Sequence, residues 1–220
     1  MSSTHKSRRV AGVTIPLFSL WTRQSAGVGD IGDLPAVARW LREGGVRLLQ
    51  VLRECPGTES HLVVSDAGWR TLRHELGLER PAVEALAHQA HDARNVGASI
   101  ASGSFQCAGM VVAPCSMRTL ASVAHSLSDN LLTRAADVVL KERRRLVLMA
   151  RETPLHLGHL RNMVSVTEMG AIVCPPVPAF YMHPQTVADI VDASVARVLD
   201  LLGVDHPLSK RWEGLSTPAA

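Results

Sequence analysis

Short apolar runs alternate with longer amphipathic segments along most of this 220-residue chain. The short runs predict strands over residues 10–17, 59–65, 109–113, 146–150 and 171–174. Apolar positions three and four apart predict helices over residues 33–42, 117–126, 131–141, 155–169 and 185–202. The strand segments are almost wholly apolar, which is typical of strands that are buried on both faces. Strands that alternate with helices predict an α/β fold with a parallel sheet.

Polar and turn residues follow the predicted strands at their carboxyl ends. They are Ser65-Asp66, residues 114–119, residues 151–154 and, a little further on, Phe180-Tyr181. In open α/β sheets, ligands bind beyond the carboxyl ends of the strands. The pattern therefore predicts a ligand site along this edge of the sheet.

Composition excludes several classes of protein. Hydrophobic residues make up 46% and charged residues 20%, as in soluble globular proteins and unlike disordered chains or coiled coils. The net charge of +3 comes from scattered basic residues, so we expect no nucleic-acid partner. No apolar run reaches the roughly 18 residues of a membrane span, and the basic first nine residues are interpreted as a tail rather than a signal peptide.

The four cysteines lie far apart in the sequence and include no Cys-x-x-Cys pair. We therefore expect neither a metal nor a redox motif. Free cysteines fit a reducing compartment, which predicts a cytoplasmic location. Cys115 follows a predicted strand, and a small buried filler is the default interpretation there.

Residues 116–119 stand where a strand gives way to a helix. Two hydroxyls, the backbone N–H groups of the first helical turn and the side chain of Arg118 would suit a phosphate group. The simpler alternative is that Ser116 only caps the helix.

A second candidate is the basic helix over residues 131–141. Arg134 and Lys141 are seven residues apart and so share a helix face, which would suit a phosphate or diphosphate. Taken alone, a solvated basic face is the better explanation.

Glu152 directly follows Arg151 after a strand of the buried type. It would serve as a general acid or base if burial raised its pKa, and a structural ion pair is an equal alternative. His156 and His159 are three residues apart, but no third ligand is placed to complete a metal site, so ordinary polar helix residues are favoured.

The chain has only four Trp, three Phe and one Tyr. Tyr181 follows a proline-rich turn, and Trp212 lies near the C-terminus. Both are candidates either for core packing or for facing a flat ring or an allylic cation.

Six blocks of this sequence together resemble the UbiX-type flavin prenyltransferases. The blocks are residues 101–105, 114–119, 132–138, 140–144, 151–156 and 175–181, within a match that runs from about residue 45 to residue 214. The resemblance implies a Rossmann-like or flavodoxin-like three-layer α/β/α fold. It also implies a dodecameric assembly and metal-independent transfer of a dimethylallyl group from dimethylallyl phosphate to N5 and C6 of reduced FMN. The product, prenylated FMN, would serve a UbiD-type decarboxylase.

The resemblance also implies roles for individual residues. Those that would hold FMN are Ser65, Ser116, Met117, Arg118, Thr119 and Arg151. Tyr181 and Arg197 would hold dimethylallyl phosphate, with Arg134 and Lys141 nearby. Glu152 would handle protons, Glu75 matches a second functional carboxylate, and Trp212 would line the site.

The first 44 residues depart from the family. The Gly-Ala-Ser-Gly-Ala loop that binds the flavin phosphate is absent, and residues 11–43 resemble the start of amylomaltase-type 4-α-glucanotransferases. We therefore expect an atypical segment over residues 1–44, with a substitute first strand and helix, ahead of a prenyltransferase-like domain over residues 45–220, all in one compact domain. The glycines of residues 27–32 are a candidate replacement for the missing loop. Residues 47–52 fit both families, as a strand in one and a helix in the other.

Three hypotheses follow for function. The first is a flavin prenyltransferase, and the second is an inactive relative that has lost its phosphate loop. The third is a flavoprotein that decarboxylates a substrate directly. Glu152, Tyr181, Arg197 and the basic helix favour the first over the third, because a decarboxylase needs no prenyl-phosphate pocket.

Overall fold

The computed structural model describes residues 8–14 and 34–208, with side chains from residue 44 onward. Its strands are β1 (Arg8–Thr14), β2 (Thr58–Val64), β3 (Gln89–Asp92), β4 (Gly109–Cys115), β5 (Arg145–Ala150) and β6 (Ile172–Val173). Its α-helices are α1 (Leu34–Glu54), α2 (Asp66–Leu76), α3 (Arg80–Glu84), α4 (Met117–Ala124), α5 (Leu131–Lys141), α6 (Leu157–Glu168) and α7 (Val187–Leu202). Two short 3-10 helices, η2 (Ser99–Ala101) and η3 (Phe180–Met182), lie in connecting segments.

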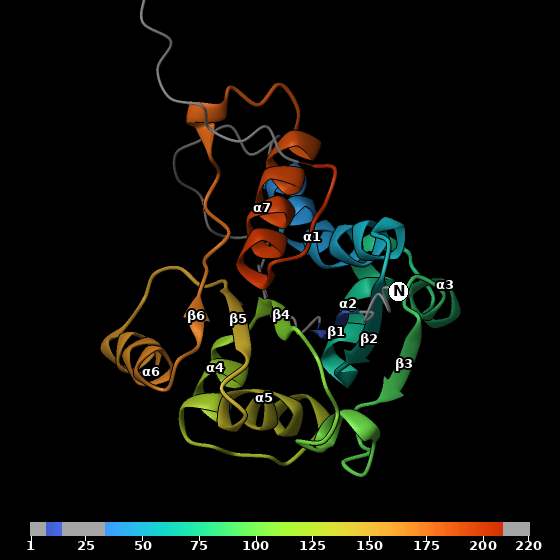
Figure 1. Ribbon diagram of the computed structural model, residues 1–220. Helices are drawn as coiled ribbons and strands as arrows, with labels where there is room; N and C mark the ends of the chain where they lie inside the picture. The colour runs from blue at the N-terminus through green and yellow to red at the C-terminus, as the bar shows by residue number, and fades with distance from the viewer. Residues whose placement is uncertain (1–7, 15–33, 209–220) are drawn as a thin grey trace, which may run out of the picture.

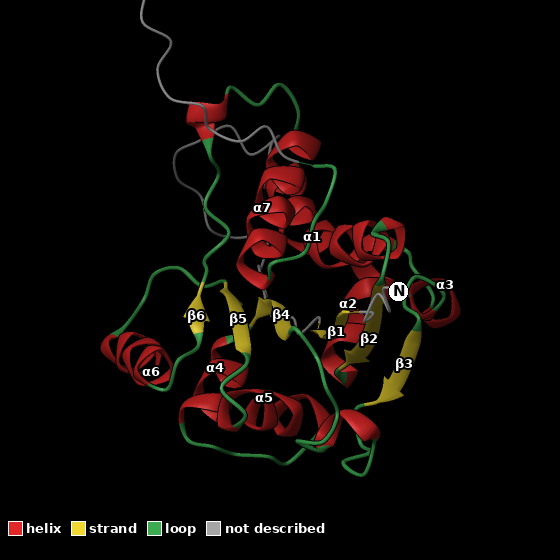
Figure 2. Cartoon of the chain, in the orientation of Figure 1, coloured by secondary structure: helices red, strands yellow, loops and turns green. Residues whose placement is uncertain are grey.

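The strands form one parallel sheet in the order β3-β2-β1-β4-β5-β6. Helices α1 and α7 pack against each other over one face, and α4, α5 and α6 lie over the other (Figure 1). Figure 2 shows the same helix–sheet–helix layering by secondary structure. The predicted three-layer α/β/α fold with a parallel sheet is therefore confirmed.

Each central strand is buried on both faces. In β2, Leu62 and Val64 belong to the core beneath α1 and α7, whereas Val63 belongs to the core beneath α4 and α5. The same alternation occurs in β4, where Val111 and Met110 belong to opposite cores. Burial on both faces explains why these strands are continuous apolar runs rather than alternating ones.

Most predicted elements are found within a few residues of their expected bounds. The helix predicted over residues 131–141 is α5, and the strand predicted over residues 10–17 is found as β1, although residues 15–17 lie outside the described part. The prediction missed α2, α3 and β3. Strand β3 has the sequence Gln-Ala-His-Asp and lies at an exposed edge, so it shows no apolar pattern.

Residues 47–52 are helical, as the prenyltransferase resemblance implies, and not a strand. They are the buried second half of α1, with Leu48, Leu49, Val51 and Leu52 at most 1% exposed. The same helix runs without a break across residues 44 and 45, where the sequence resemblance changes. The division into residues 1–44 and 45–220 thus falls inside a single helix, and the origin of the first segment stays a hypothesis.

Candidate functional site

The carboxyl ends of the parallel strands bring several predicted flavin residues to one edge of the sheet. Ser65 follows β2, Ser116 follows β4 and Arg151 follows β5. The backbone N–H of Arg151 donates to the carbonyl of Cys115 across 3.3 Å, which joins two of these segments directly. This is the edge at which open α/β sheets bind ligands.

Ser116 begins α4 with extended backbone angles (φ −71°, ψ 156°). Its Oγ accepts a hydrogen bond from the Thr119 N–H at 3.2 Å and lies 3.1 Å from Thr119 Oγ1. Thr119 is buried, Met117 is half-buried and Arg118 is exposed. Ser116 is thus a helix cap, and helix geometry leaves the Met117 and Arg118 amides without intrahelical acceptors. The turn has the donors that a phosphate group needs.

Ser65 caps α2 in the same way, with its Oγ accepting from the Gly68 N–H at 3.1 Å. Glu75 is a half-buried residue near the other end of α2. Nine residues of helix place it about 14 Å along the axis from Asp66. Within one chain, therefore, Glu75 lies well away from the Ser65 cap.

Glu152 is exposed, so the burial that would favour a general acid or base is absent in the single chain. Its Oε1 accepts a hydrogen bond from the Thr153 N–H at 3.1 Å. His156 caps α6 by accepting from the Gly158 N–H at 3.0 Å, and its ring centroid is 3.6 Å from that of His159. Across the described residues, no group of three or more His, Cys, Asp or Glu side chains is arranged to hold a metal. The role of Glu152 in proton transfer stays a prediction.

Cys115 is fully buried at the end of β4. Burial raises the pKa of its thiol to about 12, opposed by a backbone hydrogen bond from Leu120. A thiol that stays protonated at neutral pH is a poor nucleophile, so the structure agrees with its interpretation as a buried filler.

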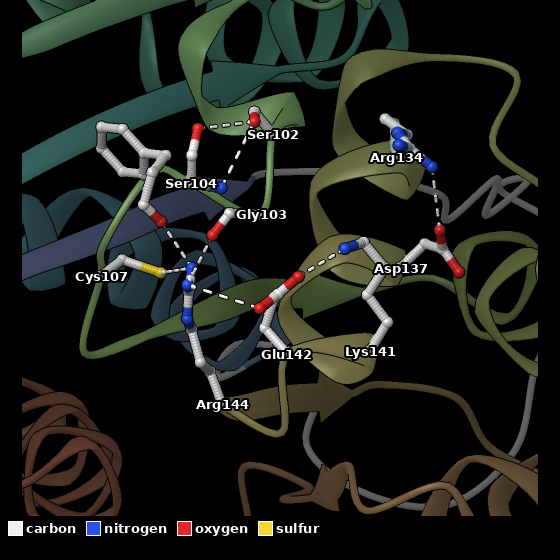
Figure 3. A network of polar contacts seen from close by, with 10 residues as sticks. Ser102, Gly103, Ser104, Cys107, Arg134, Asp137, Lys141, Glu142 and Arg144 are labelled. Atoms are coloured by element: carbon white, nitrogen blue, oxygen red, sulfur yellow. Dashed lines mark hydrogen bonds and ion pairs between the residues drawn. The ribbon is translucent and has the colours of Figure 1, made fainter.

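The cations of α5 each have a carboxylate partner (Figure 3). Arg134 Nη1 lies 3.1 Å from Asp137 Oδ2, and Lys141 Nζ lies 2.5 Å from Glu142 Oε1. The hydrogen bond from Lys141 lowers the pKa of Glu142. Because β5 begins four residues after Lys141, this lysine lies near the amino edge of the sheet. Ser116 and Arg151 lie at the opposite edge.

The remaining predicted substrate residues belong to the other helix layer. Arg197 is exposed on α7, and its charge acts on the thiol of Cys174, which directly follows β6. Burial raises the pKa of Cys174, and Arg197 opposes that shift. Tyr181 lies in η3 with 68% of its surface exposed. Trp212 lies outside the described residues. Within a single chain, Lys141 and Arg197 therefore lie at opposite edges of the sheet.

Comparisons with known proteins identify the family of this chain. A family model described as Flavoprotein matches residues 44–199. The flavin prenyltransferase UbiX of Escherichia coli (strain K12) is 56% identical over 172 residues, covering 77% of this chain and 91% of the relative. That of Neisseria meningitidis serogroup B (strain MC58) is 59% identical over 172 residues, covering 78% of this chain and 90% of the relative.

This chain belongs to the UbiX family of flavin prenyltransferases. The family resemblance seen in the sequence is thereby confirmed.

Solved structures of the same family share the fold. The crystal structure of AnUbiX (PadA1) in complex with FMN and dimethylallyl pyrophosphate matches with a TM-score of 0.81 and 39% identity, covering 95% of this chain and 99% of that one. A dodecameric FMN-dependent Ubix-like decarboxylase from Escherichia coli O157:H7 matches with a TM-score of 0.78 and 43% identity, covering 94% and 100%. The cysteine decarboxylase SpaF, at 19% identity and a TM-score of 0.51, shares the fold alone.

Sequence reasoning missed one polar network beside the basic helix of this UbiX-family chain. The guanidinium of Arg144 bonds the backbone of the loop over residues 102–107, about forty positions earlier. The resemblance included Gly103 and Arg144 among its matching blocks but implied no role for either. No local pattern connects residues so far apart in the chain.

Proposed function

We propose that this chain transfers a dimethylallyl group from dimethylallyl phosphate to reduced FMN. The observation on which this rests is the polar turn at the carboxyl end of β4, in a chain that is 56% identical over 172 residues to a flavin prenyltransferase. The helix caps after β2 and β4 supply hydroxyl and backbone donors for the flavin and its phosphate. Arg118 and Arg151 add positive charge at the same edge, so the residues present fit an anionic flavin nucleotide.

The reduced flavin would be a substrate of this reaction, and its N5 would bond the dimethylallyl group as phosphate leaves and the N5 proton is lost. C6 would then bond one alkene carbon, with one proton added to the neighbouring alkene carbon and one proton lost from C6. The protein has to stabilise the departing phosphate and move these protons. Arg134, Lys141 and Arg197 are the cations for the phosphate in this proposal. Glu152 is the proton acceptor, and Tyr181 lies against the allylic group.

A complete site in this proposal needs more than one copy of the chain. Lys141 lies at the amino edge of the sheet and Arg197 at the carboxyl end of β6, in opposite helix layers (Figure 1). Large apolar side chains around η3 and α6 are exposed in the single chain: Leu157, Leu160, Val164, Val177, Phe180 and Tyr181. Leu157, Leu160 and Val164 share one face of α6 by their spacing, and an exposed apolar helix face is typical of an interface. We therefore propose a homo-oligomer, a dodecamer as in the Escherichia coli O157:H7 relative, in which neighbouring copies bury Glu152 and supply Lys141.

Prenylated FMN would leave this protein for a UbiD-type decarboxylase. We propose the cytoplasm as the compartment, because reduced flavin and free thiols both need reducing conditions. None of the helices in the described ranges is both long and apolar enough to cross a membrane.

The first test is titration of the purified protein with FMN, followed by flavin fluorescence. Saturable binding at micromolar concentration or tighter is the expected result. The reduced complex is then mixed with dimethylallyl phosphate, and mass spectrometry follows the gain of one dimethylallyl group by the flavin. A folded protein that binds no FMN would be an inactive relative. Binding without prenyl transfer, together with loss of CO₂ from a carboxylic acid, would instead indicate a decarboxylase.

A further inference from the structure

The side chain of Arg144 bonds backbone carbonyls of the loop over residues 102–107. Only 13% of its side chain is exposed. Its Nη2 donates to the Gly103 carbonyl at 2.7 Å, and its Nη1 donates to the Phe105 carbonyl at 2.5 Å. Nη1 also lies 3.8 Å from Cys107 Sγ (Figure 3). A planar guanidinium can bond two carbonyls at once, which the ammonium group of lysine does with far less geometric control.

The turn between α5 and β5 aims Arg144 at this loop. Arg143 adopts the left-handed backbone conformation (φ 56°), which is uncommon for a residue other than glycine. The N–H groups of Arg143 and Arg144 donate to the carbonyls of Leu140 and Val139, both at 2.9 Å. The chain therefore reverses tightly after α5, and Arg144 points back toward residues 103–107.

The loop held by Arg144 lies directly against the Lys141–Glu142 pair. A Cβ atom added at Gly103 would lie 2.2 Å from Glu142 Oε1 and 2.9 Å from Lys141 Nζ. Both distances are shorter than real Cβ contacts, so the absence of a side chain at Gly103 leaves room for the Lys141 ammonium group and the Glu142 carboxylate. The loop therefore bounds one side of the space around the Lys141–Glu142 pair, while 48% of the Lys141 side chain stays exposed.

Glu142 links the same two cations by a second route. Its Oε1 is 2.5 Å from Lys141 Nζ, and its Oε2 is 3.9 Å from Arg144 Nη2. The hydrogen bond from Lys141 keeps the pKa of Glu142 below its usual value, so the carboxylate is charged at neutral pH. Arg144 therefore acts on Lys141 both through the loop backbone and through Glu142.

We propose that Arg144 is a positioning residue that fixes the Lys141 ammonium group for the substrate phosphate. This inference rests on the proposed function, in which Lys141 binds that phosphate. Lysine has a long, flexible side chain, and ordering it on binding weakens affinity. A lysine that already pairs with a carboxylate beside a fixed loop loses less freedom when the phosphate arrives.

The test is a double-mutant cycle with R144M, K141M and R144M/K141M. R144M is expected to raise KM for dimethylallyl phosphate about tenfold, with the Kd for FMN unchanged. In the K141M background, R144M should raise KM no further, because the group that Arg144 positions is gone. R145M is the matched control, since Arg145 Nη1 donates to the Leu201 carbonyl at 2.9 Å and does not contact the loop. Its KM should equal that of the wild type.

An equal rise in KM with and without Lys141 would overturn the proposal, as would a parallel loss of FMN affinity. If R144M does not fold, E142Q removes the second route alone. E142Q must then raise KM in the wild-type background and leave it unchanged in K141M. An unchanged KM in the wild-type background, or a further rise in K141M, would refute the positioning role. A wild-type protein that transfers no dimethylallyl group at all would refute the proposed function itself, which is a separate outcome.

Discussion

Replacing Ser116 with alanine separates the structural role of this residue from its proposed role in binding. In the free protein, Ser116 Oγ uses a lone pair to accept from the Thr119 N–H at 3.2 Å. It also shares a hydrogen bond with Thr119 Oγ1 at 3.1 Å. If the Thr119 hydroxyl donates in that bond, the Ser116 hydroxyl is free to donate to a flavin phosphate. S116A removes both the cap and this donor.

Two free energies follow from this geometry. Loss of a serine cap destabilises a protein by about 1 kcal/mol. Loss of a hydrogen bond to a charged phosphate costs about 1.5–3 kcal/mol of binding free energy, or roughly a 10- to 150-fold rise in the Kd for FMN. The first effect appears in unfolding, and the second appears in the flavin titration.

Thr186 provides a matched control. It caps α7, and its Oγ1 accepts from the Asp189 N–H at 3.1 Å. T186A should lose a similar amount of stability in urea unfolding and leave the Kd for FMN unchanged. If S116A loses stability but binds FMN as tightly as the wild type, Ser116 is only a helix cap, and the proposed phosphate contact is wrong.

Three further predictions concern other residues. Glu152→Gln should greatly slow prenyl transfer in single-turnover assays with FMN affinity intact; unchanged turnover would remove Glu152 from the mechanism. Burial and the neighbouring His61, 2.9 Å away, lower the pKa of His91 in the folded state, so below about pH 6.5 the unfolded chain binds more protons. Stability should therefore fall as the pH drops through that range, by at most about 1.4 kcal/mol per pH unit. In the His91→Gln variant, the urea midpoint should depend less on pH between 7.5 and 5.5. An equally steep loss of stability in the variant would contradict this. Because its pKa is about 12, Cys115 should resist a thiol reagent at pH 8 until the protein unfolds, and peptide mass spectrometry showing rapid labelling of native protein would refute its burial.

Local features of the site were predictable from sequence. Ser116 precedes a helical pattern and follows an apolar run, which indicates both a cap and the carboxyl end of a strand. The same reasoning places Arg151 and Glu152 after β5. Edge strand β3 was missed because three of its four residues are polar, and its pairing with β2 depends on the sheet rather than on its own residues.

What the sequence determined by itself is the set of interactions made within a few residues: apolar runs buried on both faces, helix faces and helix caps. These depend on periodicity and on neighbouring hydrogen bonds, so they are visible in a single segment. Tertiary structure alone decided that Arg144 bonds the Gly103 carbonyl 41 positions away, and that Arg197 on α7 lies near Cys174 after β6. Those contacts depend on how the strands are ordered and how the chain turns between them. They are therefore set by the whole fold and by no local pattern.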